Sequence, residues 1–186
     1  MRHKIYRILL LLSLALMSAF MLVPPAHCLP DNNRFAPEVV YLKPPVDTLT
    51  LSISDALAKK GEEVCVSVTA KNFDHILTMQ YTVQWDAKVL KLKEIKDFGL
   101  EGMDKRNFGM HLLDKGMLTF SWYDHQLKGI TKDDGTELYK MCFEAIGETG
   151  SETSIAVSSK PTVVEISNAA GLFLDLRSEN GEVAID

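Results

Sequence analysis

The sequence predicts an all-β protein, an antiparallel β-sandwich of about nine strands. Two observations lead to this prediction. From residue 48 onward, apolar and polar residues alternate with a period of two in short runs, the pattern of half-buried strands. Turn signals rich in glycine, asparagine and aspartate separate these runs at intervals of about 8–12 residues. Apolar residues make up 46% of the chain, enough to build a core.

The predicted strands follow one another with almost no other element between them. We expect strands over 49–53, 64–70, 79–85, 89–95, 108–113, 117–123, 138–146, 154–157 with 162–166, and 182–185. Segments 108–113 and 117–123 should form a hairpin. Segments 154–157 and 162–166 should be one strand interrupted at Lys160-Pro161, because proline cannot donate to an interior ladder. Only 55–60 is expected to be helical, for about one turn.

Residues 1–28 are typical of a secretory signal peptide. Arg2, Lys4 and Arg7 precede the apolar run Ile8–Val23, and the segment contains no acid. This run is shorter than the roughly 20 residues that span a bilayer. We expect cleavage near Cys28, which leaves no membrane span. An uncleaved anchor is the alternative, and lipidation of Cys28 is disfavoured because His27 stands where a small residue is required.

The mature chain should begin with a linker or leader over 29–47, which holds four of the seven prolines, followed by one domain over 48–186. The full chain carries 20 basic and 25 acidic residues, a net charge of −5. Loss of the three basic residues in 1–28 brings the remainder to −8. This acidity argues against nucleic acid as a partner. We expect the protein to be secreted, periplasmic or on the cell surface.

Cys65 and Cys142 both lie on the polar phase of their predicted strands. An exported protein can form disulfides, so a cross-strand disulfide is one interpretation. Two separate, partly buried thiols are the other.

Residues 49–185 resemble a cohesin domain, the β-sandwich receptor for dockerin-bearing proteins, and the resemblance implies jelly-roll topology. Four segments in order carry much of the resemblance: KKGEEV (59–64), YTVQWDAKVLKLKEI (81–95), GMLTFSWYD (116–124) and DGTELYKMCFEAIG (134–147). Ala87 replaces the family's usual proline. The resemblance implies a non-catalytic module that binds a dockerin-type partner in a cell-surface or extracellular, polysaccharide-degrading assembly.

In cohesins the partner docks on one sheet face, built from the third, fifth, sixth and eighth strands. The resemblance therefore implies a partner-binding set made of outward residues on two strands, Thr78, Gln80, Thr82, Gln84, Thr119, Ser121 and Tyr123, together with Asp124 at the end of the second strand. Tyr123 should contribute most, because a rigid aromatic with a hydroxyl suits the centre of an interface. The alternative is that these residues are only the solvated side of an antiparallel sheet.

No catalytic motif, phosphate-binding loop or metal-binding motif occurs in the sequence. His75, His111 and His125 lie far apart along the chain, and acidic loops are usually solvated. We therefore expect no enzyme, no cofactor and no metal site. The competing function is a carbohydrate-binding module with polysaccharide as its ligand. It requires a row of exposed aromatics, and the inward phase of Trp85 and Trp122 disfavours it.

Overall fold

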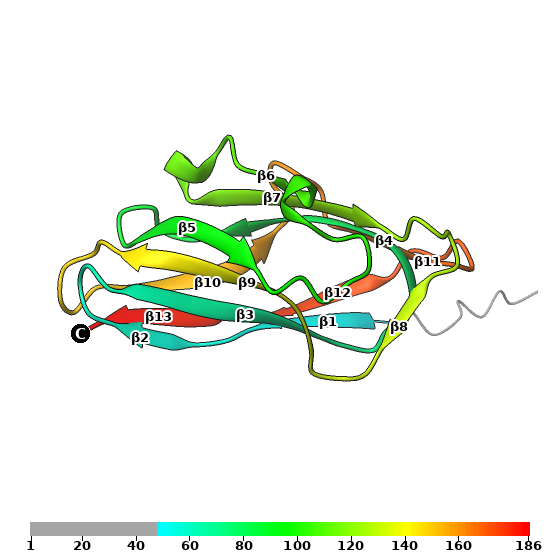
Figure 1. Cartoon of the computed structure of the whole chain (residues 1–186), viewed down its shortest axis with the longest axis horizontal. Coiled ribbons are helices and arrows are strands. Elements are labelled where there is room, and N and C mark those ends of the chain that lie inside the picture. The colour runs from blue at the N-terminus through cyan, green and yellow to red at the C-terminus, as the bar shows by residue number, and fades with distance from the viewer. Residues whose placement is uncertain (1–47) are drawn as a thin grey trace, which may run out of the picture. The chain divides into compact units, whose positions relative to one another are not determined.

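The computed structural model describes residues 48–186, which form two packed β-sheets (Figure 1). The predicted signal peptide, the linker over 29–47 and Cys28 lie outside the described residues. Within 48–186, no helix has the length and apolar character needed to cross a bilayer.

The first sheet has five strands in the order β12-β1-β3-β9-β5. Their bounds are Asp175–Glu179, Thr48–Ile53, Glu63–Lys71, Thr136–Ala145 and Leu90–Lys96.

The second sheet has eight strands, six of them in the order β2-β13-β10-β4-β7-β6, with β8 and β11 also paired to β4. In the same order their bounds are Ala56–Ala58, Gly181–Ile185, Glu152–Ser158, Phe73–Gln84, Met117–Tyr123 and Phe108–Gly109, then Ile130–Lys132 and Glu165–Asn168. Two short 3-10 turns, Lys105–Asn107 and Leu113–Lys115, complete the described elements.

The alternation in the sequence sets which side chains fill the space between the sheets. On β3, Val64, Val66 and Val68 are buried, and the residues between them face outward. The aromatic centre of the core joins both sheets, because Tyr81 of β4 and Tyr139 of β9 both pack on Phe120 of β7. The two tyrosine hydroxyls lie 3.1 Å apart and hydrogen-bond across the core. Burial raises the pKa of both phenols above the ordinary value.

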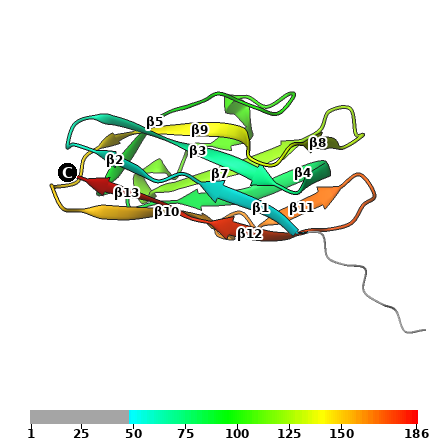
Figure 2. The same ribbon diagram turned by 90° about the horizontal axis from the view of Figure 1, so that it is seen from below.

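The sandwich is all-β, but its sheets are mixed, a correction to the wholly antiparallel prediction. β1 runs parallel to β12, and β2 runs parallel to β13. The first strand pair and the last therefore cross together from one sheet to the other (Figure 2). At the crossing, Asp55 accepts a hydrogen bond from the backbone N–H of Glu182, 2.8 Å away. Gly181 packs against the Ser54 carbonyl, where a Cβ would clash.

The predicted helical turn at 55–60 is wrong, because Ala56–Ala58 is strand β2. Pairing with β13 overrides the local helix preference of this short segment. The described residues contain thirteen strands rather than about nine, since several long strands are split between sheets or interrupted.

The predicted interruption at Lys160-Pro161 is confirmed. β10 and β11 lie one after the other along the same side of β4, with Val157 opposite Val83 and Ile166 opposite Met79. The predicted hairpin is also present, although its first arm, β6, has only two residues.

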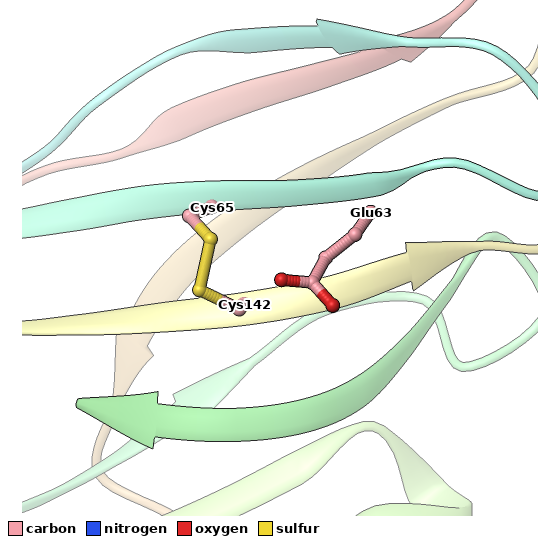
Figure 3. A group of neighbouring side chains, drawn as sticks. All are labelled: Glu63, Cys65 and Cys142. Atoms are coloured by element: carbon pink, nitrogen blue, oxygen red, sulfur yellow. A yellow bond between two sulfur atoms is a disulfide. The ribbon is translucent and has the colours of Figure 1, made fainter.

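Cys65 and Cys142 are register partners on β3 and β9 and form a disulfide, with Cα atoms 4.0 Å apart (Figure 3). The bond lies on the outer side of the five-stranded sheet, and Cys142 is buried there. The middle strand of that sheet, β3, is thus covalently joined to its neighbour β9.

Candidate partner-binding face

The outer side of β4, β7 and β11 forms a continuous surface, which we call the candidate face. It consists of Thr78, Gln80, Thr119, Ser121, Tyr123, Glu165 and Ser167. Register pairing arranges these residues in rows across the strands. In one row Gln80 lies between Ser121 of β7 and Glu165 of β11, and in the next Thr78 lies between Tyr123 and Ser167. Directly paired residues of antiparallel strands share one face of the sheet.

A shallow hollow of about 310 Å³ occupies the middle of this face. Five of its lining residues, Thr78, Gln80, Ser121, Tyr123 and Glu165, are polar or amphipathic. The hollow therefore offers hydroxyl, amide and carboxylate oxygens beside one aromatic ring. Such a surface suits directional hydrogen bonds to a partner.

Tyr123 is exposed, with 52% of its surface accessible. Its ring stacks on that of His125, with ring centroids 4.6 Å apart and planes 17° apart. The His125 ring in turn lies against Gly102. Beside it, the Asn107 side chain donates to the Ser121 carbonyl at 2.9 Å. Tyr123 is therefore held in place before any partner arrives, which lowers the entropy cost of binding.

Thr82 and Gln84 also point outward, but the segment after β10 covers them. Thr82 is fully buried, and its hydroxyl accepts from the backbone N–H of Thr162 at 3.1 Å. Gln84 donates its side-chain amide to the Lys160 carbonyl at 3.0 Å. These contacts use the two polar side chains internally and mark one border of the candidate face.

Asp124 is buried and organises the loop after β7. Its carboxylate accepts hydrogen bonds from the backbone N–H groups of Gln126, Lys128 and Gly129 at 2.9–3.0 Å. These bonds, with the Gln126 contact the largest, hold the pKa of Asp124 below its ordinary value. Only 4% of the Asp124 surface is exposed, so its role is to shape the loop beside Tyr123.

Sequence reasoning missed Glu165, Ser167 and Phe173. The alternation that placed Ile166 in a strand also turns Glu165 and Ser167 outward, so the signal was present. Phe173 lies in a turn after β11 and bridges to Ser167. No periodicity marks it.

The tryptophans do not form a sugar-binding row. Trp85 and Trp122 are 7% and 1% exposed, and Phe108 is also buried. Among residues 48–186, Tyr123 and Phe173 are the two exposed aromatic side chains.

Within 48–186, one group of three side chains of the kinds that bind metals lies close together: Glu63, Cys65 and Cys142 (Figure 3). Both cysteines are joined in the disulfide, so neither supplies the thiolate that a metal would require.

A two-sheet sandwich that presents a polar face around an ordered aromatic has the form of a protein-interaction module. Residues 49–170 match the cohesin domain model, which covers more than half of the chain. The chain belongs to the cohesin family, whose domain is a non-catalytic protein-interaction module.

Solved structures similar to this chain are also cohesins. The sixth cohesin of scaffoldin B from Acetivibrio cellulolyticus, in complex with the Cel5 dockerin, is 19% identical, with a TM-score of 0.61 over 75% of this chain and 99% of that one. The OlpA cohesin of Clostridium thermocellum, in complex with a dockerin, is 14% identical, with a TM-score of 0.63 over 75% and 99%.

A non-cellulosomal cohesin from the hyperthermophilic archaeon Archaeoglobus fulgidus is 17% identical, with a TM-score of 0.60 over 75% of this chain and 91% of that one. At sequence identities this low, the structural similarity to these three cohesins establishes the fold of the chain. No curated protein matches the sequence of this chain.

Proposed function

We propose that this protein is an exported cohesin that binds a dockerin-bearing protein through the candidate face. The observation that carries the proposal is the family match combined with an accessible, pre-ordered Tyr123 among polar groups. Two of the similar cohesin structures contain a bound dockerin, which supports this class of partner.

Two features favour an extracellular or cell-surface location. Residues 1–28 have the composition of a signal peptide, and disulfides such as Cys65–Cys142 persist in oxidising compartments. A polysaccharide-degrading assembly is one setting for such a receptor. The similar archaeal cohesin is non-cellulosomal, so the proposal concerns a dockerin partner rather than one particular assembly.

Calorimetric titration of residues 29–186 with the dockerins encoded in the same genome tests the proposal. We expect at least one dockerin to bind, and Tyr123→Ala to weaken that binding by about 2 kcal/mol, or roughly 30-fold. Leu57→Ala is the matched control, because Leu57 is 64% exposed on β2, outside the candidate face. Absence of binding by every dockerin would refute the proposal, and unchanged binding by Tyr123→Ala would refute the placement of the site.

A further inference from the structure

A slit opens on the side of the sandwich where the chain moves from one sheet to the other. Leu174 donates its backbone N–H to the Ile166 carbonyl of β11 at 3.0 Å, and Gly181 pairs with Ile155 of β10. Between these two points the chain leaves the eight-stranded sheet and pairs, as β12, with β1 (Figure 2). The slit that results has a volume of about 380 Å³ and is lined by Val157, Ser159, Val164, Leu174, Asp175, Leu176 and Ser178.

β12 is an edge strand that can accept a further strand. In the part of the chain that the structure describes, it pairs only with β1, over five residues in unbroken register. The other edge of the same sheet, β5, has a bulge between Leu92 and Glu94 and carries Lys91, Lys93 and Lys96. Bulges and edge lysines prevent the addition of a strand, and β12 has neither.

The two sides of β12 differ in chemistry. Leu176 is half-buried and lines the slit with Ser178, whereas Arg177 and Glu179 are exposed on the outer side of the sheet. Asp175 shares the outer phase, and within 48–186 no hydrogen bond or ion pair engages its carboxylate. An added strand therefore needs apolar residues on the slit side. On the outer side it needs a cation opposite Asp175 and an aromatic ring or an anion opposite Arg177.

Residues 38–43 of this chain, EVVYLK, have this pattern. Pro37 and Pro44 flank them, and proline is confined to places where a ladder needs no donor. Valine and tyrosine are favoured in strands. In the antiparallel register that places Lys43 opposite Asp175, the pairs that follow are Leu42 with Leu176, Tyr41 with Arg177 and Val40 with Ser178. The apolar side chains then cover the slit, and a slip by one residue would turn them to the outer side.

The connection to β1 is long enough for this register. Thr48 pairs with Asp175 from the β1 side, so Lys43 and Thr48 would lie two strand spacings apart, about 10 Å. Residues 44–47 can span up to about 16 Å. The chain reaches β12 from the eight-stranded sheet, on the inner side of the five-stranded one, so the crossing of 44–47 uses the outer side.

We propose that residues 39–43 add to β12 as an antiparallel edge strand and close the slit. The inference goes beyond the proposed function and concerns a different surface from the candidate face. The added strand removes a five-residue edge at which exported copies could associate.

A second copy suits this edge less well than the chain's own segment. Antiparallel pairing of two β12 strands along their full length places Arg177 opposite Arg177 and Asp175 opposite Glu179. Like charges that lie directly opposite each other destabilise a strand pair. The chain's own segment avoids this repulsion, and its short connection gives it an effective concentration of about millimolar.

Nuclear magnetic resonance of labelled residues 29–186 tests the proposal. We expect cross-strand NOEs from Leu42 to Leu176 and from Val40 to Ser178, in a protein that sediments as a monomer. Exchange of alternate amides in 39–43 should be at least about tenfold slower than in the free peptide 29–47. Absence of these NOEs, NOEs in another register, or the expected NOEs only in a dimer would overturn the inference.

A charge exchange tests the register. Lys43→Glu and Asp175→Lys each place like charges opposite one another and should speed amide exchange in 39–43 about threefold, whereas the double variant should return to within about twofold of the native rate. Arg34→Glu makes the same charge change before Pro37 and should leave the rate unchanged. No recovery in the double variant, or an equal effect of Arg34→Glu, would refute this register. Neither experiment depends on whether a dockerin binds.

Discussion

Removal of the Cys65–Cys142 disulfide should strongly destabilise the fold. The bond joins positions separated by 77 residues, and the chain-entropy relation gives about 4.5 kcal/mol for closing a loop of that size. Native disulfides in small secreted domains contribute about 2–5 kcal/mol. We therefore expect the double variant Cys65→Ala/Cys142→Ala to lose about 3 kcal/mol of unfolding free energy.

Urea unfolding of residues 29–186, followed by tryptophan fluorescence, measures this loss, because Trp85 and Trp122 are both buried. With an m value of about 1.5 kcal/mol per M, the midpoint should fall by about 2 M. Residues 29–186 contain no other cysteine, so a thiol reductant should lower the native midpoint and leave that of the variant unchanged. Two titratable thiols in the unfolded, unreduced protein, or a shift below about 0.5 M, would refute the reasoning.

Three further predictions concern the core, a loop and a turn. Tyr139→Phe leaves the Tyr81 hydroxyl unpaired and should cost about 1–3 kcal/mol in urea unfolding. Adding Tyr81→Phe should cost less than the two single changes together, and strict additivity would contradict the pairing. The folded pKa of Asp124 lies below its ordinary 3.8, so its stabilisation is present above that value and lost as pH falls through the folded pKa. Asp124→Ala should therefore lower the urea midpoint near neutral pH, with a gap that narrows in acid; a constant gap would contradict this. Gly116→Ala should cost about 2 kcal/mol more than Gly135→Ala, because both have positive φ but only the first new Cβ meets a backbone carbonyl. Equal urea midpoints would show that the turn adjusts freely.

Much of the fold follows from local alternation, because burial of every second side chain is a property of each strand alone. Val64, Val66 and Val68 identify their strand and its inner face before any partner is known. β12 could not be found this way: Asp175, Arg177 and Glu179 are exposed, and the segment is a strand because its backbone pairs with β1.

The candidate face shows a similar division. The alternation correctly predicts that Thr82 points away from the core. The segment that then buries Thr82 comes later in the chain and is positioned by tertiary contacts, including the hydrogen bond from the Thr162 backbone N–H to the Thr82 hydroxyl. Asp124 is predicted to meet a partner at the end of its strand, but it is buried and accepts hydrogen bonds from three backbone N–H groups of its own loop. Whether an outward residue stays accessible depends on the path of the loops, which periodicity does not encode.

The parallel pairing of the first strands with the last has a mechanical consequence. Thr48 begins at one end of the paired strands, and the chain leaves β13 at the other. A pull on these two ends slides β1 and β2 lengthwise against β12 and β13. Their hydrogen bonds then bear the load together rather than opening one after another, as they would in a peeled hairpin. We therefore expect the domain to resist unfolding when tension is applied along its chain.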